Sequence, residues 1–275
     1  MRGTSGNRAK VVLFDLDGTL VKAGGAGRLA LNRAVERLYG LKDVCFKFSL
    51  AGRMDRDNFE LAFKAARGRR PTARERRGLE AAYLRRLPLE VRRAVREKRY
   101  AKIPGISKLI EKLSRRPEVL VGLGTGNMER GARIKLRPSG LLRYFAFGGY
   151  GSDGRSRVHM LRVAVRRAKA ILRARMPAGG PIAPGSIFVI GDTPRDVRAG
   201  KKAGYRTGAV TRGFGEPEAL RRARPELLAP DFRDRRLWLD WISSLGIAAS
   251  GQPPCRGGKR ALRRNRRCST KARRR

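Results

Sequence analysis

Short runs of consecutive apolar residues recur along the chain, and segments of helix length separate them. The runs cover residues 11–14, 119–121 and 187–190, and weaker strand signals lie near residues 145–147, 205–210 and 226–228. Continuous apolar runs of this length are typical of strands that are buried on both faces of a parallel sheet. The intervening segments are residues 106–115, 129–136, 158–175 and 196–203. This alternation predicts an α/β fold with a Rossmann-like parallel sheet as its core.

One long interval breaks the alternation. Between residues 26 and 100 the apolar residues have helical spacing, with Leu29, Val35 and Leu38 as one predicted face. No convincing strand interrupts this interval, so we predict a helical domain inserted after the first strand. The predicted boundaries are residues 1–22 and 103–248 for the core and residues 23–102 for the helical domain.

The charge balance of the chain is far from ordinary. Its 66 lysines and arginines oppose 23 aspartates and glutamates, which gives a formal net charge of +43. A field of this sign attracts phosphates, nucleic acids and anionic membranes, but it says nothing about the fold. Because the excess is spread along the whole chain, a compositional habit of the source organism explains it at least as well as a nucleic-acid site.

The end of the chain is more basic still. Residues 251–275 contain eleven lysines and arginines, no acid and almost nothing apolar. Burial cannot offset the ordering entropy of such a segment, so residues 249–275 are predicted to be a disordered basic tail. Two interpretations stay open: weak, non-specific contact with nucleic acids or acidic proteins, and a solvated tail without a partner.

The cysteines and the apolar runs argue against several protein classes. Cys45, Cys255 and Cys268 are odd in number and lack CxxC spacing, so they predict neither a disulfide framework nor a zinc site. The apolar runs fall short of the roughly 18 residues that a membrane span needs, and the N-terminus lacks the apolar block of a signal peptide. We therefore expect no membrane partner and a reducing, cytoplasmic setting.

The first apolar run leads directly into two carboxylates, in the segment VVLFDLDGTL. Asp15 and Asp17 are two positions apart, so both side chains point the same way at a strand end. Ligands of parallel α/β sheets bind beyond the carboxyl ends of the strands, and both acids are therefore expected in the binding crevice. Their repulsion is costly unless a cation, a shared proton or a division of roles relieves it.

The other two strong runs also end in polar segments. Thr125, Gly126 and Asn127 follow the second run, and they offer a hydroxyl and backbone N–H groups as a cradle for phosphate oxygens. Asp192 and Asp196 follow the third run. Clustered carboxylates suit a hard cation such as Mg²⁺, which usually keeps some waters and binds substrate phosphate.

The segments FDLDGTL, GTGN and GDTPRD occur in this order, with a helical insertion after the first. In this they resemble the haloacid dehalogenase superfamily and, within it, the phosphoglycolate-phosphatase-like branch. The resemblance covers roughly residues 8–248. It implies a parallel α/β core, a helical cap that closes over the site, a Mg²⁺ cofactor and phosphoryl transfer through an aspartyl-phosphate.

The resemblance also implies a role for each motif residue. Asp15 would be the nucleophile, and Asp17 would be the general acid and then the general base. Mg²⁺ would be held by Asp15, by the backbone carbonyl of Asp17 and by Asp192. Asp196 would be a further ligand or would support the ligands. Thr125 would donate a hydrogen bond to the transferred phosphoryl group.

One element departs from the family pattern. The family usually places a lysine between the second and last motifs, but the corresponding stretch GGYGSDGRSRVHML has none. Arg157 is the best candidate for that role, and Arg155 is the alternative. Arginine binds phosphate in bidentate fashion, although it is not interchangeable with lysine. His159, two positions further on, is predicted to have no chemical role.

Residues 51–55, in the helical insertion, resemble the cap loop that reaches toward the substrate. Arg53 would contact a carboxylate or a second phosphate on it, unless Arg53 is an ordinary surface arginine and Asp55 a helix cap. Residues 24–27 resemble a hinge between core and cap. The candidate substrate-binding residues are Arg53, Asp55, Gly126 and Asn127.

Together these features predict a Mg²⁺-dependent phosphomonoester phosphatase that acts on a small, anionic, phosphoglycolate-like metabolite. A sugar phosphomutase of the same superfamily is the nearest alternative, because the same core and cap support it. An alternative of a different class is a basic nucleic-acid-binding protein with an incidental phosphatase core, motivated by the +43 charge.

Overall fold

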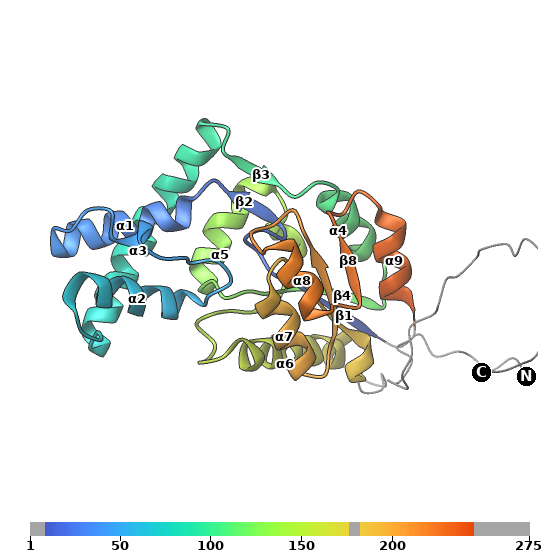
Figure 1. The fold of residues 1–275 in the computed structure, drawn as a ribbon. Coiled ribbons are helices and arrows are strands. Elements are labelled where there is room, and N and C mark those ends of the chain that lie inside the picture. Colours follow the sequence, from blue (N-terminus) through green and yellow to red (C-terminus); the bar gives the residue numbers. More distant parts are fainter. Residues whose placement is uncertain (1–8, 176–181, 245–275) are drawn as a thin grey trace, which may run out of the picture.

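The computed structural model describes residues 9–175 and 182–244, and it confirms the α/β fold class (Figure 1). Parallel strands form one six-stranded sheet in the order β5-β4-β1-β6-β7-β8. The strands are β1 (Lys10–Phe14), β4 (Val119–Gly124), β5 (Gly148–Gly149), β6 (Ile187–Gly191), β7 (Arg206–Val210) and β8 (Leu227–Ala229). The three strong apolar runs of the sequence are the adjacent strands β4, β1 and β6, which lie in the middle of the sheet.

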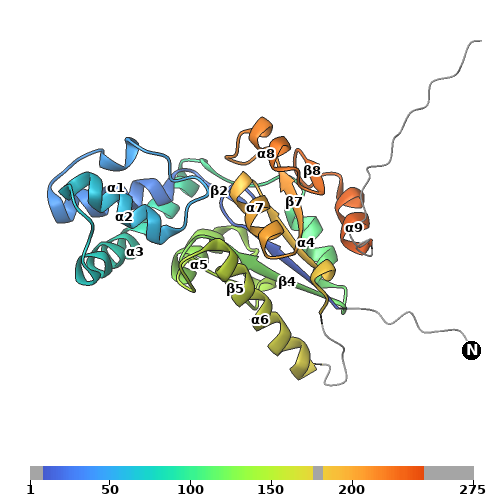
Figure 2. The same ribbon diagram turned by 60° about the horizontal axis from the view of Figure 1, so that its bottom comes forward.

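Helices cover both faces of the sheet. They are α4 (Ile106–Ser114), α5 (Glu129–Leu136), α6 (Arg157–Arg175), α7 (Pro194–Lys202), α8 (Pro217–Ala223) and α9 (Arg235–Ser243), with the short helices η2 (Arg137–Ser139), η3 (Leu142–Tyr144) and η4 (Pro184–Ser186). Val12 and Phe14 of β1 pack with α4 and α9, whereas Val11 and Leu13 pack with α6. Figure 2 shows α6 and α7 on the near face of the sheet. The unbroken apolar runs thus supply two cores, one on each face.

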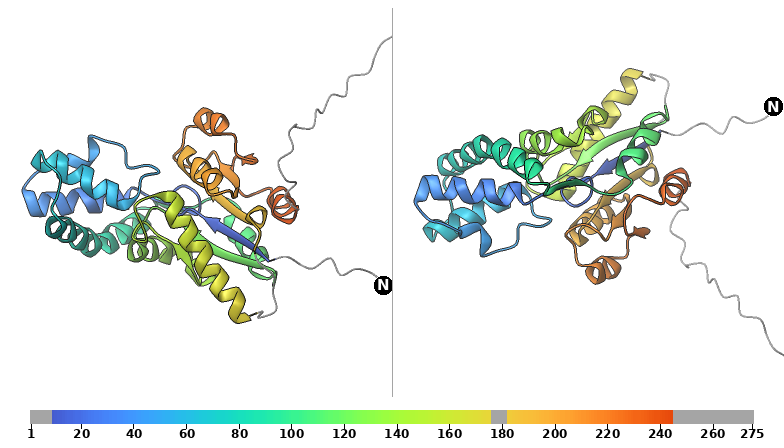
Figure 3. Two further views of the ribbon diagram at one scale, coloured as in Figure 1. Left: turned by 90° about the horizontal axis from the view of Figure 1, so that it is seen from below. Right: turned by 90° about the horizontal axis from the view of Figure 1, so that it is seen from above.

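The interval between residues 26 and 100 forms a separate group of helices. They are α1 (Ala26–Tyr39), η1 (Val44–Phe46), α2 (Asp55–Arg67) and α3 (Ala73–Arg96). These helices enclose their own core, in which Phe63, Leu79 and Leu87 are fully buried. In both views of Figure 3 this group lies at the opposite end of the molecule from α9. The predicted helical cap inserted after the first strand is confirmed.

Two short strands that the pattern did not predict join the cap to the core. β2 (Val21–Ala23) pairs antiparallel with β3 (Tyr100–Lys102). Three residues are too few to display a periodicity, so sequence reasoning had no signal for this ribbon. Gly24 and Gly25 follow β2 with φ of 59° and 80°, a left-handed conformation that favours glycine. The predicted domain boundaries lie at this ribbon, and they stay a prediction.

The strand expected near residues 145–147 lies further along the chain, at β5. Phe145 and Phe147 are buried, so their apolar signal marks core packing rather than strand pairing. Pairing with β4 requires a close backbone approach, because a Cβ added at Gly148 would lie 2.9 Å from the Cβ of Leu123. Glycines therefore occupy the paired positions.

The predicted apolar face of α1 was only partly right. Val35 is fully buried, but Leu38 is 41% exposed. Ala30 and Ala34 take places in the buried face instead. Small residues on this face let α1 pack closely against its neighbours in the cap, and alanine carries a weak apolar signal in a sequence.

Several expectations concern the ends of the chain. Cys255, Cys268 and the predicted tail at residues 249–275 lie outside the described residues. Cys45 is buried and forms no disulfide in the described part of the chain. Among residues 9–175 and 182–244, the structure contains no helix with the length and apolarity needed to cross a bilayer.

Phe188 offers a direct test of the central core. Its side chain is fully buried, and its ring centroid lies 5.0 Å from that of Trp241. Phe188→Ala should lower the free energy of unfolding by about 3–5 kcal/mol, because it removes buried apolar surface and leaves a cavity. Phe46→Ala is the matched control, since Phe46 is 51% exposed. It should change the free energy of unfolding by about 0.5 kcal/mol or less. Urea unfolding of both variants measures the difference, and equal losses would contradict this assignment of the core.

Candidate active site

The carboxyl ends of the three central strands bring the motif residues to one edge of the sheet. Asp15 follows β1, Thr125 follows β4 and Asp192 follows β6. The strands are in register at this edge, with Phe14 paired to Leu123 on one side and to Ile190 on the other. Residues more than 170 positions apart therefore meet because they follow neighbouring strands.

Three of the predicted acids form a buried cluster. Asp15, Asp192 and Asp196 each present a carboxylate oxygen, and these oxygens lie within 4.8 Å of one another. Burial and repulsion by Asp196 raise the pKa of Asp15 to about 7. Burial and repulsion by Asp15 and Asp196 also raise the pKa of Asp192 well above its usual value. A cation bound among these carboxylates would therefore stabilise their ionised forms.

Two hydrogen bonds hold the Asp192 carboxylate in place. Its Oδ2 accepts a hydrogen bond from the backbone N–H of Phe214 at 2.6 Å, and its Oδ1 accepts from Thr19 Oγ1 at 3.3 Å. Gly18 and Gly213 press against the same carboxylate. A Cβ at either position would lie within 2.3 Å of an Asp192 atom. These loops leave room for the carboxylate only because both positions are glycine.

Asp196 is held by its own helix and by an arginine. It closes a capping box at the N-terminus of α7, where its Oδ2 accepts from the backbone N–H of Thr193 at 3.1 Å and from Thr193 Oγ1 at 2.6 Å. Its other oxygen is hydrogen-bonded to Arg157. Both carboxylate oxygens of Asp196 thus have hydrogen-bond partners. This favours a supporting role for Asp196 over direct binding of a metal ion.

Arg157, the candidate for the role of the family lysine, lies beside the acid cluster. Its side chain is 10% exposed, and its Nη1 lies 3.9 Å from Asp15 Oδ1 while pairing with Asp196. Burial lowers the pKa of Arg157, but attraction by Asp196 and Asp15 outweighs burial and keeps the guanidinium charged. Arg155 and His159 are exposed. The geometry therefore favours Arg157 over Arg155 for this role.

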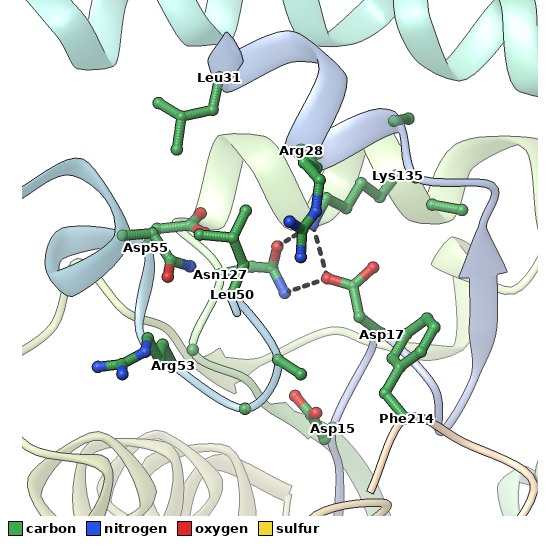
Figure 4. Close-up of a pocket in the computed structure, with 18 of the residues that line it drawn as sticks. Asp15, Asp17, Arg28, Leu31, Leu50, Arg53, Asp55, Asn127, Lys135 and Phe214 are labelled. Carbon is green, nitrogen blue, oxygen red and sulfur yellow. Dashed lines mark hydrogen bonds and ion pairs between the residues drawn. The ribbon is translucent and has the colours of Figure 1, made fainter. Parts of the chain in front are cut away.

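The carboxylate of Asp17 does not join the acid cluster. Its Oδ2 accepts hydrogen bonds from Lys135 Nζ at 2.6 Å and from Asn127 Nδ2 at 3.0 Å (Figure 4). The two acids of the first motif thus have separate partners, Arg157 for Asp15 and Lys135 for Asp17. A contribution of Asp17 to a metal site would have to come from its backbone carbonyl.

The second motif connects these two acids. Thr125 is fully buried, and its Oγ1 accepts hydrogen bonds from Asn127 Nδ2 at 2.9 Å and Asn127 N at 3.3 Å. A hydrogen bond from Thr125 favours the ionised form of Asp15. The carbonyl of Gly126 accepts a hydrogen bond from the cap, from the backbone N–H of Asp55 at 2.8 Å. The motif thus touches Asp15, Asp17 and the cap.

A cavity of about 210 Å³ opens above the acids, between core and cap. Arg28, Leu31, Arg53 and Tyr83 are among the cap residues that line it, and Phe214 lines it from the core side. Figure 4 shows Asp15 and Asp17 on one side of this space and Leu31, Leu50 and Asp55 on the other. The cap therefore provides most of the wall that a leaving group would meet.

The two predicted cap residues have different roles in the structure. Arg53 donates from Nε to the carbonyl of Ser49 at 3.2 Å, and no hydrogen bond of its terminal nitrogens is found within the described residues. Asp55, in contrast, is buried, and its Oδ2 accepts from the backbone N–H of Met128 at the start of α5, at 2.9 Å. Asp55 thus ties the cap to the core through Oδ2, and it also lines the cavity.

The donor set of the acid cluster fits a divalent cation. Oxygen ligands from clustered carboxylates are what Mg²⁺ prefers in proteins, and it often keeps several waters as well. Asp15 and Asp192 have oxygens in the shared space, and the raised pKa of each shows that an added positive charge would stabilise the ionised cluster.

Sequence reasoning missed several residues that shape this site. Lys135, Thr19, Arg28 and Phe214 all contact or line it. Lys135 is one of 66 lysines and arginines, and it lies within a predicted helix where nothing marks it as special. Phe214 and Thr19 lie close to predicted strands, but only the folded chain shows that both bind Asp192.

Comparison with known proteins agrees with this geometry. A family model described as haloacid dehalogenase-like hydrolase matches residues 9–204. Solved structures of similar fold include one described as a predicted phosphoglycolate phosphatase from Haemophilus somnus, with 17% identity, TM-score 0.60, and coverage of 86% of this chain and 100% of that chain. No curated protein matches the chain.

Two further solved structures share the fold. A candidate β-phosphoglucomutase from Bacteroides vulgatus has 18% identity and TM-score 0.62, with coverage of 87% of this chain and 93% of that chain. CbbY from Rhodobacter sphaeroides, solved in complex with phosphate, has 19% identity and TM-score 0.61, with coverage of 82% and 95%. These likenesses establish the fold. Because the family model spans most of the chain and includes all three motifs that meet at the sheet edge, the chain belongs to the haloacid dehalogenase-like hydrolases.

Proposed function

We propose that this hydrolase is a Mg²⁺-dependent phosphomonoester phosphatase that works through an aspartyl-phosphate on Asp15. The observation that carries the proposal is the buried cluster of Asp15, Asp192 and Asp196, whose member Asp15 lines a cavity together with Asp17 and Arg157. Mg²⁺, when bound, would offset the repulsion between these carboxylates and a phosphate dianion. Asp15, Asp17 and Arg157 would each have a different role in the reaction.

In the first step a carboxylate oxygen of Asp15 attacks the phosphorus atom, and the bond from phosphorus to the leaving oxygen breaks. Asp17 gives its proton to that oxygen. In the second step Asp17, now a carboxylate, takes a proton from a water whose oxygen attacks the phosphorus. The bond to Asp15 breaks, inorganic phosphate leaves, and both acids return to their starting states. Arg157, 3.9 Å from Asp15, would stabilise the charge on the transferred group.

We propose a small anionic metabolite as the substrate. Cationic side chains, among them Arg28, Arg53, Lys135 and Arg157, line the cavity and suit an anionic compound. Arg53 lies in the cap wall, and a carboxylate on the substrate could bind its terminal nitrogens in bidentate fashion. The structural similarity to a predicted phosphoglycolate phosphatase gives phosphoglycolate as the first compound to test.

A sugar phosphomutase is the second candidate, favoured by the structural similarity to a candidate β-phosphoglucomutase. The two activities share the aspartyl-phosphate and differ in the acceptor, which is water in one and a sugar hydroxyl in the other. Steady release of inorganic phosphate without an isomeric sugar phosphate decides for the phosphatase. An isomer formed without free phosphate decides for the mutase.

Asp15→Asn should bring turnover of phosphomonoesters to background while the fold is kept. The amide is a poor nucleophile, and the change removes charge from a crowded cluster rather than adding volume. Phosphate release and the melting temperature should be measured together. Asp240→Asn is the matched control, because Asp240 is an exposed acid on α9 whose side chain is 71% exposed. Full activity of Asp15→Asn refutes the nucleophile assignment.

Mg²⁺ should raise the melting temperature of the protein, and Asp192→Asn should reduce that effect. A ligand present at 100 times its Kd stabilises the folded state by about 2.7 kcal/mol, which corresponds to roughly 5–10 °C for a chain of this size. Thermal unfolding with Mg²⁺ and with excess EDTA measures the shift without any substrate. An equal Mg²⁺ shift in wild type and Asp192→Asn would remove Asp192 from the metal site.

Arg53→Ala should raise KM selectively for substrates that carry a carboxylate. We expect an increase of about 10–150-fold with phosphoglycolate, since one charge-assisted hydrogen-bonded contact contributes about 1.5–3 kcal/mol. Little change is expected with ethyl phosphate, which has a methyl group in place of the carboxylate. Steady-state kinetics with both compounds gives the comparison. Arg92→Ala, at an exposed position of α3, is the control. An equal effect on both substrates would exclude carboxylate recognition by Arg53.

A further inference from the structure

The contact between Lys135 and Asp17 engages only one side of the acid. Asp17 Oδ2 receives two donors, Lys135 Nζ at 2.6 Å and Asn127 Nδ2 at 3.0 Å. Its second oxygen, Oδ1, makes no hydrogen bond with any described residue. Figure 4 shows both dashed contacts converging on a single oxygen of the carboxylate. The side chain is thus fixed in direction while one oxygen stays available for proton transfer.

Lys135 is itself held in place. Its Nζ also donates to Asn127 Oδ1 at 2.6 Å, and its backbone carbonyl accepts a hydrogen bond from Tyr100 Oη at 2.9 Å. The side chain is only 7% exposed. The first turn of α1 covers it, because a Cβ added at Gly27 would lie 3.1 Å from Lys135 Nζ. The Lys135 end of the pair is thus shielded from water, while the Asp17 side chain is 29% exposed. A partly desolvated pair is stronger and more directional than a fully exposed one.

The same network reaches the nucleophile. Asn127 Nδ2 bonds both to Asp17 and to Thr125 Oγ1, and Thr125 in turn hydrogen-bonds Asp15. Lys135 is therefore the charged end of a chain of contacts that links the two acids of the first motif.

We propose that Lys135 is a positioning residue that holds the carboxylate of Asp17 through Oδ2, so that Oδ1 faces the leaving oxygen and then the attacking water. The inference rests on the proposed function in taking Asp17 as the general acid and base. Positioning of this kind matters because proton transfer needs a donor–acceptor distance of about 2.6–3.2 Å. A side chain that is free to rotate would spend much of its time outside that range.

The test is a double-mutant cycle in the full-length chain, with p-nitrophenyl phosphate and Mg²⁺ as the probe. Lys135→Met should lower kcat by about 10–100-fold, the usual effect of removing a residue that orients a reacting group, and should change KM by less than about threefold. In an Asp17→Asn background the same change should lower kcat by less than about twofold, because the group that Lys135 orients is already lost. The inference is overturned if the effects of the two substitutions on the logarithm of kcat are fully additive, or if kcat rises in Lys135→Met.

Two controls separate positioning from folding. Lys112→Met, at an exposed position of α4, should leave kcat and KM unchanged. Lys135→Gln keeps a hydrogen-bond donor without the charge, and it enters the same cycle if Lys135→Met does not give folded protein. Melting temperatures of all variants are measured alongside, since a purely structural role would lower them without the non-additivity in kcat.

A crystal structure of Lys135→Met supplies a readout that needs no turnover. The Asp17 side chain should leave the rotamer of the wild type or occupy more than one position. An unchanged, fully ordered Asp17 overturns the inference even if no substrate is ever found. Absence of phosphate release by the wild type, in contrast, counts against the proposed function, so the two failures are distinguishable.

Discussion

Repulsion among buried carboxylates is the constraint on which the rest of this structure depends. Asp15, Asp192 and Asp196 bring oxygens within 4.8 Å of one another in a site almost without solvent. Such a cluster exists only because the surrounding fold holds it against that repulsion. Three neighbouring strand ends, a capping box and backbone N–H donors fix the acids, and Arg157 supplies the nearest opposite charge. The same repulsion makes the cluster receptive to a cation and then to a phosphate.

The high positive charge of the chain does not by itself determine which cations pair with the acids of the site. The chain carries 66 lysines and arginines, yet the ion pairs to Asp15, Asp17 and Asp196 within the described residues come from Arg157 and Lys135. Each of these two serves one acid of the first motif, Arg157 beside Asp15 and Lys135 on Asp17. Local geometry therefore separates the two acids chemically, although they are only two positions apart, while the remaining positive charge favours the approach of anionic substrates.

The cap takes part in the site through backbone contacts as well as side chains. Asp55 accepts a hydrogen bond from Met128 and donates one to the carbonyl of Gly126, so the start of α2 is tied to the loop that follows β4. The cap covers Lys135 and forms much of the cavity wall. Burial of Lys135 beneath the cap strengthens its pair with Asp17, because the pair is less screened by water.

By itself the sequence determined the fold class, the inserted helical cap and the residues that meet at the sheet edge. These follow from local signals: unbroken apolar runs give buried parallel strands, and polar residues directly after them lie at the carboxyl ends. It could not determine β5 or the β2–β3 ribbon, because two or three residues show no period. Only the tertiary structure decided that Arg157 reaches Asp15, that Asp55 binds the core, and that Lys135 holds Asp17 across 118 positions of sequence. Such pairings depend on distances between elements, and no short stretch of sequence encodes those distances.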